Sequence, residues 1–271
     1  MVIIMNSLQS ASLIEFFTNF DIFLLISIRL IGFFIVAPIV STPYIPMRAK
    51  ISFSIFFAYI IFISGKITDV FYYDSIPGYF AIGIQELIVG IIIGLTSYIV
   101  FSIIFFAGQL MDYQIGFSMV NVLDPVSQVQ VPVTGNLFYF FICLILIESG
   151  GLHSFISAIF YSYDVLPIGA AKILANPVST RLFMNLLSEY LVLGVLIAFP
   201  IVGTILIIDV VLGIVVKAVP QMNVFAVGMP IKLLLGLTII YLIVPYYMAV
   251  YNTLFDKAFN TIMFMIRGLM P

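Results

Sequence analysis

The stretch that decides the fold is residues 76–107, IPGYFAIGIQELIVGIIIGLTSYIVFSIIFFA, an apolar run of 32 residues with one acidic residue, Glu86. As a straight helix it would extend about 48 Å, whereas the hydrocarbon core of a bilayer is about 30 Å thick. Soluble domains contain about 25% charged residues, and this chain contains 8%. The run therefore predicts a long helix that lies in lipid or among other apolar subunits.

Five further apolar runs surround this one and predict an all-α membrane protein of long kinked helices and helical hairpins. They cover residues 22–40, 51–64, 133–147, 182–216 and 224–254. Their lengths range from 14 to 35 residues, whereas a spanning helix needs about 20. The Lys and Arg residues of the loops are divided nearly evenly between the two sides of the membrane, so they do not determine the orientation of the chain in it. We therefore expect that these helices do not all cross a bilayer in the finished state.

Several charged residues lie inside the apolar runs or near their ends, and a charge near the centre of a bilayer costs about 2.5–3.5 kcal/mol on insertion. Arg29 cannot lose its proton, and Glu86 and Glu148 are its candidate partners. A proton relay through Glu86 or Asp209 is an alternative. The charges expected to be buried and paired between helices or between subunits are Arg29, Glu86, Asp209, Lys217 and Lys232.

Two patterns of small and polar residues predict special contacts. Gly90 and Gly94 form a GxxxG pattern, which lets two helix backbones approach closely. Residues 108–132, GQLMDYQIGFSMVNVLDPVSQVQVP, separate two apolar runs and carry mostly uncharged polar and soft apolar side chains. This composition suits a plug that seals a conduit and repacks when something passes, although a plain extramembrane loop or re-entrant turn is the alternative.

Several classes of function are not supported by the sequence. The formal net charge of −2 gives no indication of nucleic-acid binding, and the single cysteine, Cys143, cannot form an internal disulfide. No group of His, Cys and carboxylates has metal-ligand spacing, and no HExxH or GxSxG motif occurs. We therefore expect no metal, no cofactor and no enzymatic activity. A secondary transporter is a further alternative, although no inverted repeat relates the two halves.

Six motifs, in the same order along the chain, resemble those of the FliR family, the export-gate subunits of the flagellar type III secretion system. The FliR family is related to the SctT and YscT proteins of injectisomes. The resemblance covers essentially the whole chain, and the LPIG motif and the ending Leu269-Met270-Pro271 favour a flagellar member over an injectisome member. The motifs are RLIGFFIVAP at 29–38 with Ile45-Pro46 and Lys50; Gln85-Glu86 with Gly90 and Gly94; Gly108, Asp112, Gly116 and Asp124-Pro125; GGLH at 150–153; LPIG at 166–169; and PQMNVFAVGMP at 220–230 with Lys232 and Gly236.

The resemblance implies a single domain over residues 1–271, in which a FliP-like part (about 1–180) is joined to a FliQ-like helical hairpin (about 181–271). It implies a pore complex with FliP- and FliQ-like subunits, together with FlhB-like and FlhA-like proteins and membrane lipid. This complex would lie in the bacterial inner membrane, within the flagellar basal body, and pass unfolded rod, hook and filament proteins. The equivalent subunit of a virulence injectisome is the alternative.

The resemblance also assigns the plug to residues 116–131, within the loop 108–132. The implied plug or pore-lining residues are Gly116, Phe117, Ser118, Met119, Asn121, Asp124 and Pro125. Further along the chain, two Pro-containing stretches bracket a short non-helical or kinked connection between the last two apolar runs. The residues predicted for this hairpin tip are Pro220, Gln221, Gly228 and Pro230.

Overall fold

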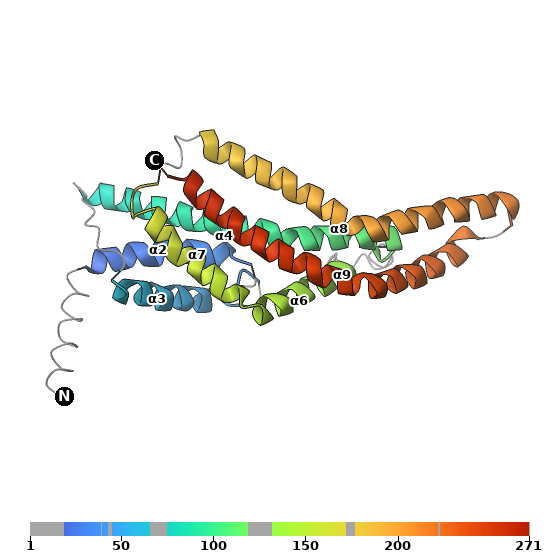
Figure 1. The fold of residues 1–271 in the computed structure, drawn as a ribbon, viewed down its shortest axis with the longest axis horizontal. Coiled ribbons are helices and arrows are strands. Elements are labelled where there is room, and N and C mark those ends of the chain that lie inside the picture. Colours follow the sequence, from blue (N-terminus) through green and yellow to red (C-terminus); the bar gives the residue numbers. More distant parts are fainter. Residues whose placement is uncertain are drawn as a thin grey trace, which may run out of the picture. The chain divides into compact units, whose positions relative to one another are not determined.

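The structure is a computed structural model that describes residues 19–38, 40–42, 45–65, 75–118, 132–171, 177–221 and 223–270. Over these residues every regular element is an α-helix (Figure 1). The helices are α2 (Phe20–Val36), α3 (Met47–Ile63), α4 (Ile76–Ile115), α6 (Val133–Glu148), α7 (Gly151–Val165), α8 (Pro177–Ala218) and α9 (Val224–Gly268). The predicted all-α fold is confirmed, and each of the six apolar runs corresponds to one helix, whose ends lie between 0 and 14 residues from those of the run.

Helix α7 is the element that the apolar runs do not predict. Its sequence, GLHSFISAIFYSYDV, mixes polar and apolar residues. Ala158, Ile159, Ser162 and Tyr163 are buried, and their spacing places them on one side of the helix. A search for uninterrupted apolar runs overlooks such a helix, because only one of its faces is buried.

The chain divides into two compact units that alternate along the sequence. The first unit contains Met1–Tyr98, His153–Phe183 and Phe259–Pro271, and the second contains Ile99–Leu152 and Met184–Ala258. Helices α4, α7, α8 and α9 therefore contribute residues to both units. This division is a different one from the predicted boundary near residue 180, and the FliP-like and FliQ-like parts stay a prediction.

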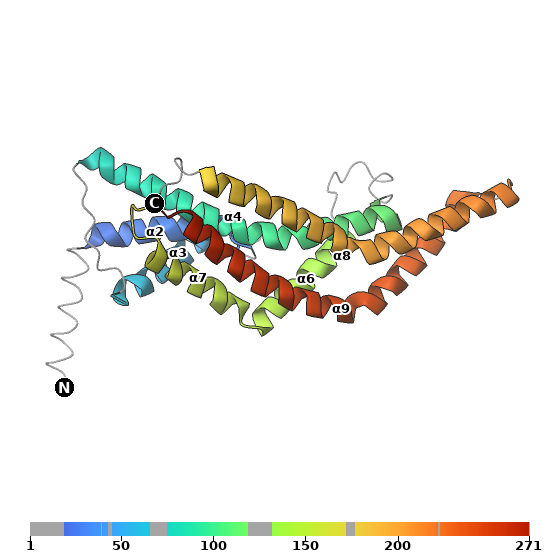
Figure 2. The same cartoon turned by 45° about the horizontal axis from the view of Figure 1, so that its top comes forward.

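In the first unit, α2 and α3 lie side by side (Figures 1 and 2), and α2 packs against the first half of α4. The contact between α2 and α4 brings backbone against backbone. A Cβ atom on Gly90 would lie 2.0 Å from the carbonyl oxygen of Arg29, and one on Gly94 would lie 2.8 Å from that of Phe33. The close approach that the GxxxG pattern predicts is therefore present, and it places Arg29 directly against α4.

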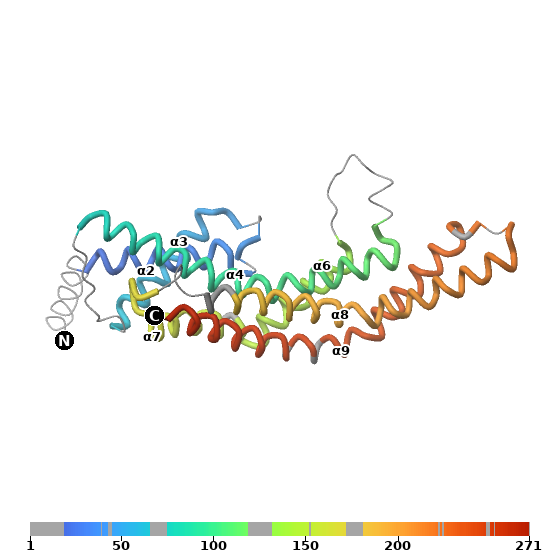
Figure 3. The backbone as a smooth tube through the Cα atoms, turned by 90° about the horizontal axis from the view of Figure 1, so that it is seen from above, coloured from blue at the N-terminus to red at the C-terminus, as the bar shows by residue number. Residues whose placement is uncertain are grey.

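In the second unit, α8 and α9 form an antiparallel hairpin (Figure 3), as their contacts show. The hydroxyl of Tyr247 donates a hydrogen bond to the carbonyl oxygen of Ile197 at 2.6 Å, and Lys257 forms an ion pair with Glu189 at the end farther from the connection. Helix α8 continues through Pro200. It does so although proline lacks the N–H that would bond one turn back.

The connection between α8 and α9 is shorter than the predicted hairpin tip. Pro220 and Gln221 lie in it and are exposed, in agreement with the expected non-helical connection. Gly228 and Pro230 instead lie inside α9, which begins at Val224. A proline is tolerated in the first turn of a helix because the first N–H groups have no intrahelical acceptor. Pro230 lies beyond that turn, so α9 lacks one backbone hydrogen bond at this residue.

Within the part of the chain that the structure describes, three helical segments are long and apolar enough to cross a membrane, and α6 with α7 would make a fourth if the two form one broken span. The three are Ile76–Ile115, Arg181–Ala218 and Phe225–Tyr247. In the most apolar window of the second segment 28% of the residues are buried, and in that of the third segment 17%. The hairpin thus presents apolar side chains that need lipid or apolar protein around them.

Candidate functional site

A buried ionic network lies in the first unit, centred on Arg29, whose side chain is 1% exposed. Its Nε donates to Oε2 of Glu86, and its Nη2 donates to the carbonyl oxygen of Leu166 at 3.1 Å. Its Nη1 lies 3.3 Å from both the carbonyl oxygen and the hydroxyl of Ser162, and its Cζ lies 4.1 Å from the ring centre of Tyr163. Arg29 is therefore neutralised and hydrogen-bonded within its own chain.

The second oxygen of Glu86 extends this network to the turn at residues 166–169. Its Oε1 accepts a hydrogen bond from the backbone N–H of Gly169 at 2.9 Å, and the neighbouring Gln85 donates to the carbonyl oxygen of Gly169 at 3.3 Å. Gly169 has a φ of 77°, a conformation that favours glycine. The LPIG motif is thus the turn that α4 holds through Glu86. Glu148, the other candidate partner of Arg29, is exposed.

A second arrangement, in the second unit, ties the end of α4 to the start of α6. Asp112 is buried near the end of α4, and its carboxylate accepts hydrogen bonds from the backbone N–H of Thr134, at 3.1 and 3.2 Å, and from the Thr134 hydroxyl. Helix α6 has Pro132 at its N-cap position and no capping side chain of its own. Asp112 therefore caps α6 from another helix.

Backbone contact reinforces this junction. A Cβ atom on Gly108 would lie 2.1 Å from the Cα atom of Gly135, so α4 and α6 meet without a side chain between them. Helix α4 ends at Ile115, and the next residue, Gly116, has a φ of 101° and donates its N–H to the carbonyl oxygen of Asp112 at 3.0 Å. We call the contacts of Gly108, Asp112, Thr134 and Gly135 the α4–α6 junction. It joins the two ends of the segment 116–131.

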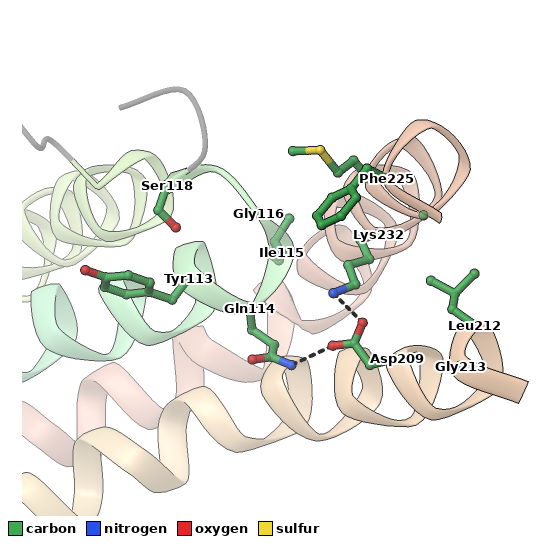
Figure 4. Close-up of a pocket in the computed structure, with 12 residues that line it drawn as sticks. Tyr113, Gln114, Ile115, Gly116, Ser118, Asp209, Leu212, Gly213, Phe225 and Lys232 are labelled. Atoms are coloured by element: carbon green, nitrogen blue, oxygen red, sulfur yellow. Dashed lines mark hydrogen bonds and ion pairs between the residues drawn. The ribbon is translucent and has the colours of Figure 1, made fainter. Parts of the chain in front are cut away.

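A pocket of about 510 Å³ in the second unit lies beside the end of α4 (Figure 4). Asp209 of α8 forms an ion pair with Lys232 of α9 and accepts a hydrogen bond from Nε2 of Gln114 at 3.1 Å. Figure 4 shows Gln114 and Lys232 reaching Asp209 from different helices. The remaining labelled walls are mostly apolar or small: Tyr113, Ile115, Gly116, Ser118, Leu212, Gly213 and Phe225.

This polar contact joins the hairpin to the start of the segment 116–131. Asp209 and Lys232 are 35% and 24% exposed, so solvent screens the pair and its contribution to stability is about 0–1 kcal/mol. Its main effect is therefore on position: it keeps α8, α9 and the last turn of α4 together through one carboxylate. A mixed polar and apolar wall of this kind can accommodate different side chains without a rigid lattice of ion pairs.

The predicted site residues fall into three groups. Arg29 with Glu86, and Asp209 with Lys232, are paired between helices of this chain, so for these four no partner subunit is needed. Lys217, predicted to be buried, is exposed, because it lies in the last turn of α8 next to the connection. Gly116, Phe117 and Ser118 are half-buried, whereas Met119, Asn121, Asp124 and Pro125 lie outside the described residues.

The sequence alone did not indicate the roles of Thr134, Ser162 and Gln114. Thr134 lies 22 residues after Asp112, and no local pattern relates the two. Ser162 belongs to the unpredicted helix α7. Gln114 lies four residues before Ser118 in the segment 108–132, which is rich in uncharged polar side chains. The composition of that segment was the only feature of the sequence that pointed to Gln114.

Comparison of the sequence with known proteins shows the family of this chain. The sequence pattern of the family described as "Bacterial export proteins, family 1" matches residues 20–258. The chain is 30% identical over 254 residues to the flagellar biosynthetic protein FliR of Aquifex aeolicus, covering 92% of this chain and 96% of that one. It is 27% identical over 243 residues to FliR of Bacillus subtilis, covering 89% and 93%.

A relative from another system matches a smaller part. The surface presentation of antigens protein SpaR of Shigella sonnei is 28% identical over 159 residues, covering 58% of this chain and 60% of that one. The matches to FliR proteins extend over nearly the whole of both chains, so the flagellar branch is favoured, as the sequence motifs predict. The chain belongs to family 1 of the bacterial export proteins, the family of the FliR proteins, and it is a component of a secretion apparatus and not an enzyme.

Proposed function

We propose that this chain is a gate subunit of the flagellar type III secretion apparatus and assembles with FliP- and FliQ-like subunits into a pore. The pore lies in the bacterial inner membrane, within the flagellar basal body, where FlhB-like and FlhA-like proteins join it. Unfolded rod, hook and filament proteins pass through it. The greater coverage of the FliR proteins than of SpaR supports the flagellar form of this proposal.

The observation that carries the proposal is the length of the exposed apolar surface on α8. Exposed large apolar side chains occur from Met184 to Ile214, a distance of about 45 Å along the helix. Even at a tilt of about 40°, this surface is taller than a hydrocarbon core of about 30 Å. Lipid alone covers it only if the bilayer thickens locally, whereas apolar surfaces of other subunits cover it without that cost.

The α4–α6 junction supports a gating role for the segment 116–131. A plug must stay attached when cargo displaces it, which requires that its two ends be held while its middle can move. Asp112 and Thr134 supply the fixed ends, and the pocket around Asp209 and Lys232 adjoins the first of them. The plug residues proposed from the resemblance lie between these ends.

Two experiments test the proposal. A strain that lacks the gene should secrete no hook or filament protein and bear no filaments, and expression of the wild-type chain should restore both. Purification of the tagged chain should bring down small FliP- and FliQ-like membrane proteins in a stable particle. A deletion strain that still exports filament protein would reject the function, and a chain that purifies alone and fully lipid-embedded would reject the assembly.

The plug assignment has its own test. A variant with the segment 116–131 shortened, and with the α4–α6 junction intact, should assemble normally and leak small ions across the membrane. The matched control is Lys217→Gln, which alters an exposed residue of the second unit outside the pocket. An assembled, shortened variant whose membrane stays as tight as the control would show that the plug lies elsewhere.

A further inference from the structure

The α8–α9 hairpin has a proline inside each of its two helices, Pro200 in α8 and Pro245 in α9. The hydrogen bond from the Tyr247 hydroxyl to the Ile197 carbonyl oxygen fixes which residues of the two helices lie opposite each other. Pro200 is three residues nearer the connection than Ile197. Pro245 is two residues nearer it than Tyr247. The two prolines therefore lie at the same level of the hairpin, to within about one helical turn. We call the part between these prolines and the connection the outer half of the hairpin.

Each proline weakens its helix at this level, because it has no N–H to donate to the carbonyl oxygen one turn back. The carbonyl oxygens that lose this intrahelical partner are those of Leu196 and Tyr241. In α8 the hydroxyl of Thr204 also donates to the carbonyl oxygen of Pro200 at 2.7 Å, a type of bond that often bends helices. Figure 3 shows α8 and α9 bending together partway along the hairpin. The hairpin is therefore least stiff where both helices lack a backbone bond.

Helix α4 contacts the hairpin on both sides of this level. On the side away from the connection, a Cβ atom on Gly194 would lie 2.9 Å from Cδ1 of Phe106. In the outer half, a Cβ atom on Gly236 would lie 2.8 Å from Cγ1 of Ile115, which is fully buried. No proline lies in α4 between Phe106 and Ile115, so this stretch of helix can act as a brace that holds both parts of the hairpin.

The contact of α4 with the outer half is the one that can open. Its polar part consists of the Gln114–Asp209 hydrogen bond of 3.1 Å and the ion pair of Asp209 with Lys232. Asp209 and Lys232 are 35% and 24% exposed and line the pocket of about 510 Å³ in Figure 4, which leaves them room to reorient. Water can replace both polar bonds at small cost, so the outer half is held without being locked.

We propose that Pro200 and Pro245 form a hinge across the hairpin, and that the last turn of α4 holds this hinge in one position through Gln114 and Ile115. Release of that turn lets the outer half swing relative to the rest of the hairpin. Hinges in proteins are a few positions that absorb a change of backbone angles. The inference rests on the proposed function only for its purpose, since a gate must change shape as cargo passes.

The test measures a distance across the hinge by double electron–electron resonance, with the full chain in lipid nanodiscs. Nitroxide labels are attached at Leu191→Cys and Ile214→Cys, two exposed positions of α8 on either side of Pro200. The single cysteine is removed by Cys143→Ser. In a straight helix the two positions lie about 35 Å apart. The labelled chain should give a broad distance distribution, and adding Pro200→Ala and Pro245→Ala, which restore the missing N–H groups, should narrow it about twofold.

Two further variants locate the hinge and the contact that holds it. Pro230→Ala is the matched control, because it removes a proline of α9 that lies in the outer half, away from the paired level, and it should leave the distribution unchanged. Gln114→Leu should broaden the distribution, because the last turn of α4 then no longer bonds to Asp209. A labelled chain whose distribution is already as narrow as that of the paired alanine variant has a fixed bend, which overturns the hinge.

The other outcomes are equally decisive. Narrowing by Pro230→Ala to the same extent would place the movement elsewhere in the hairpin and overturn the hinge. An unchanged distribution in Gln114→Leu would overturn the role of the last turn of α4.

Secretion separates this inference from the proposed function. In the deletion strain, the chain with Pro200→Ala and Pro245→Ala should assemble but secrete several-fold less hook protein than the wild-type chain. Normal secretion by that variant would overturn a part for the hinge in export. Failure of the wild-type chain to restore secretion would instead reject the proposed function, and the distance measurement would still decide whether the hairpin has a hinge.

Discussion

Removing the charge of Glu86 should destabilise the chain strongly, because it leaves Arg29 buried without its counter-charge. Breaking a buried ion pair from one side costs about 3–5 kcal/mol. Glu86→Met also takes the acceptor from the N–H of Gly169, whereas Arg29 keeps its contacts to the carbonyl oxygens of Ser162 and Leu166. We therefore expect Glu86→Met and Arg29→Met each to lower the free energy of unfolding by about 3–5 kcal/mol.

The double variant separates the charge effect from the packing effect. With both charges removed, the main unsatisfied groups are the Leu166 carbonyl and the Gly169 N–H, which cost about 1–3 kcal/mol each. The double variant should therefore lose about 2–6 kcal/mol, whereas the losses of the two single variants sum to about 6–10 kcal/mol. The measurement is a denaturant titration of the purified chain in detergent micelles, followed by circular dichroism.

An exposed ion pair serves as the control for this cycle. Lys257 and Glu189 are 38% and 57% exposed, so Lys257→Met should change the free energy of unfolding by about 1 kcal/mol or less. Additive effects of the Arg29 and Glu86 substitutions, within about 0.5 kcal/mol, would show that the two side chains do not act as a pair and would refute the reasoning.

Three further predictions concern other contacts. Gly90→Ala should lower the free energy of unfolding by about 1–3 kcal/mol through overpacking. Gly213→Ala, with no atom within 4 Å of the added Cβ, should be neutral or stabilising in the same titration. Equal losses for the two variants would contradict the close contact of α2 with α4. Asp112→Ala should lower the free energy of unfolding by about 0.5–2 kcal/mol and speed hydrogen exchange at the start of α6. Unchanged exchange there would show that groups other than Asp112 cap α6. Lys232→Met should change stability by about 1 kcal/mol or less, with a difference from wild type that shrinks as salt is added; a salt-independent loss of several kcal/mol would contradict a solvent-screened pair.

The apolar runs were sufficient to predict the helices because burial in lipid or protein requires apolar side chains on every face of a helix. For α7 this reasoning fails, since one of its faces is polar and it lies against α2 through Ser162 and Tyr163. The hairpin tip was predicted too long for a related reason. Gly228 and Pro230 weaken a helix by propensity, but the contacts of α9 with α8 and α4 keep that stretch helical.

Pairing of charges could be predicted in kind but not in partner. A buried Arg29 demands a counter-charge, and the sequence leaves Glu86 and Glu148 as equal candidates. The choice depends on the close approach of α2 to α4 at Gly90, which brings Glu86 within reach. The intrachain pairing of Asp209 with Lys232 likewise depends on the antiparallel register of α8 and α9, which charge spacing along one helix does not reveal.

The α4–α6 junction has a consequence for how such proteins can diverge. Because Asp112 and Gly108 hold both ends of the intervening stretch, residues can be inserted into or removed from it without disturbing the helices on either side. Doubling the length of a closed loop costs only about 0.6 kcal/mol. The length of this stretch can therefore vary while the helices on either side keep their stability.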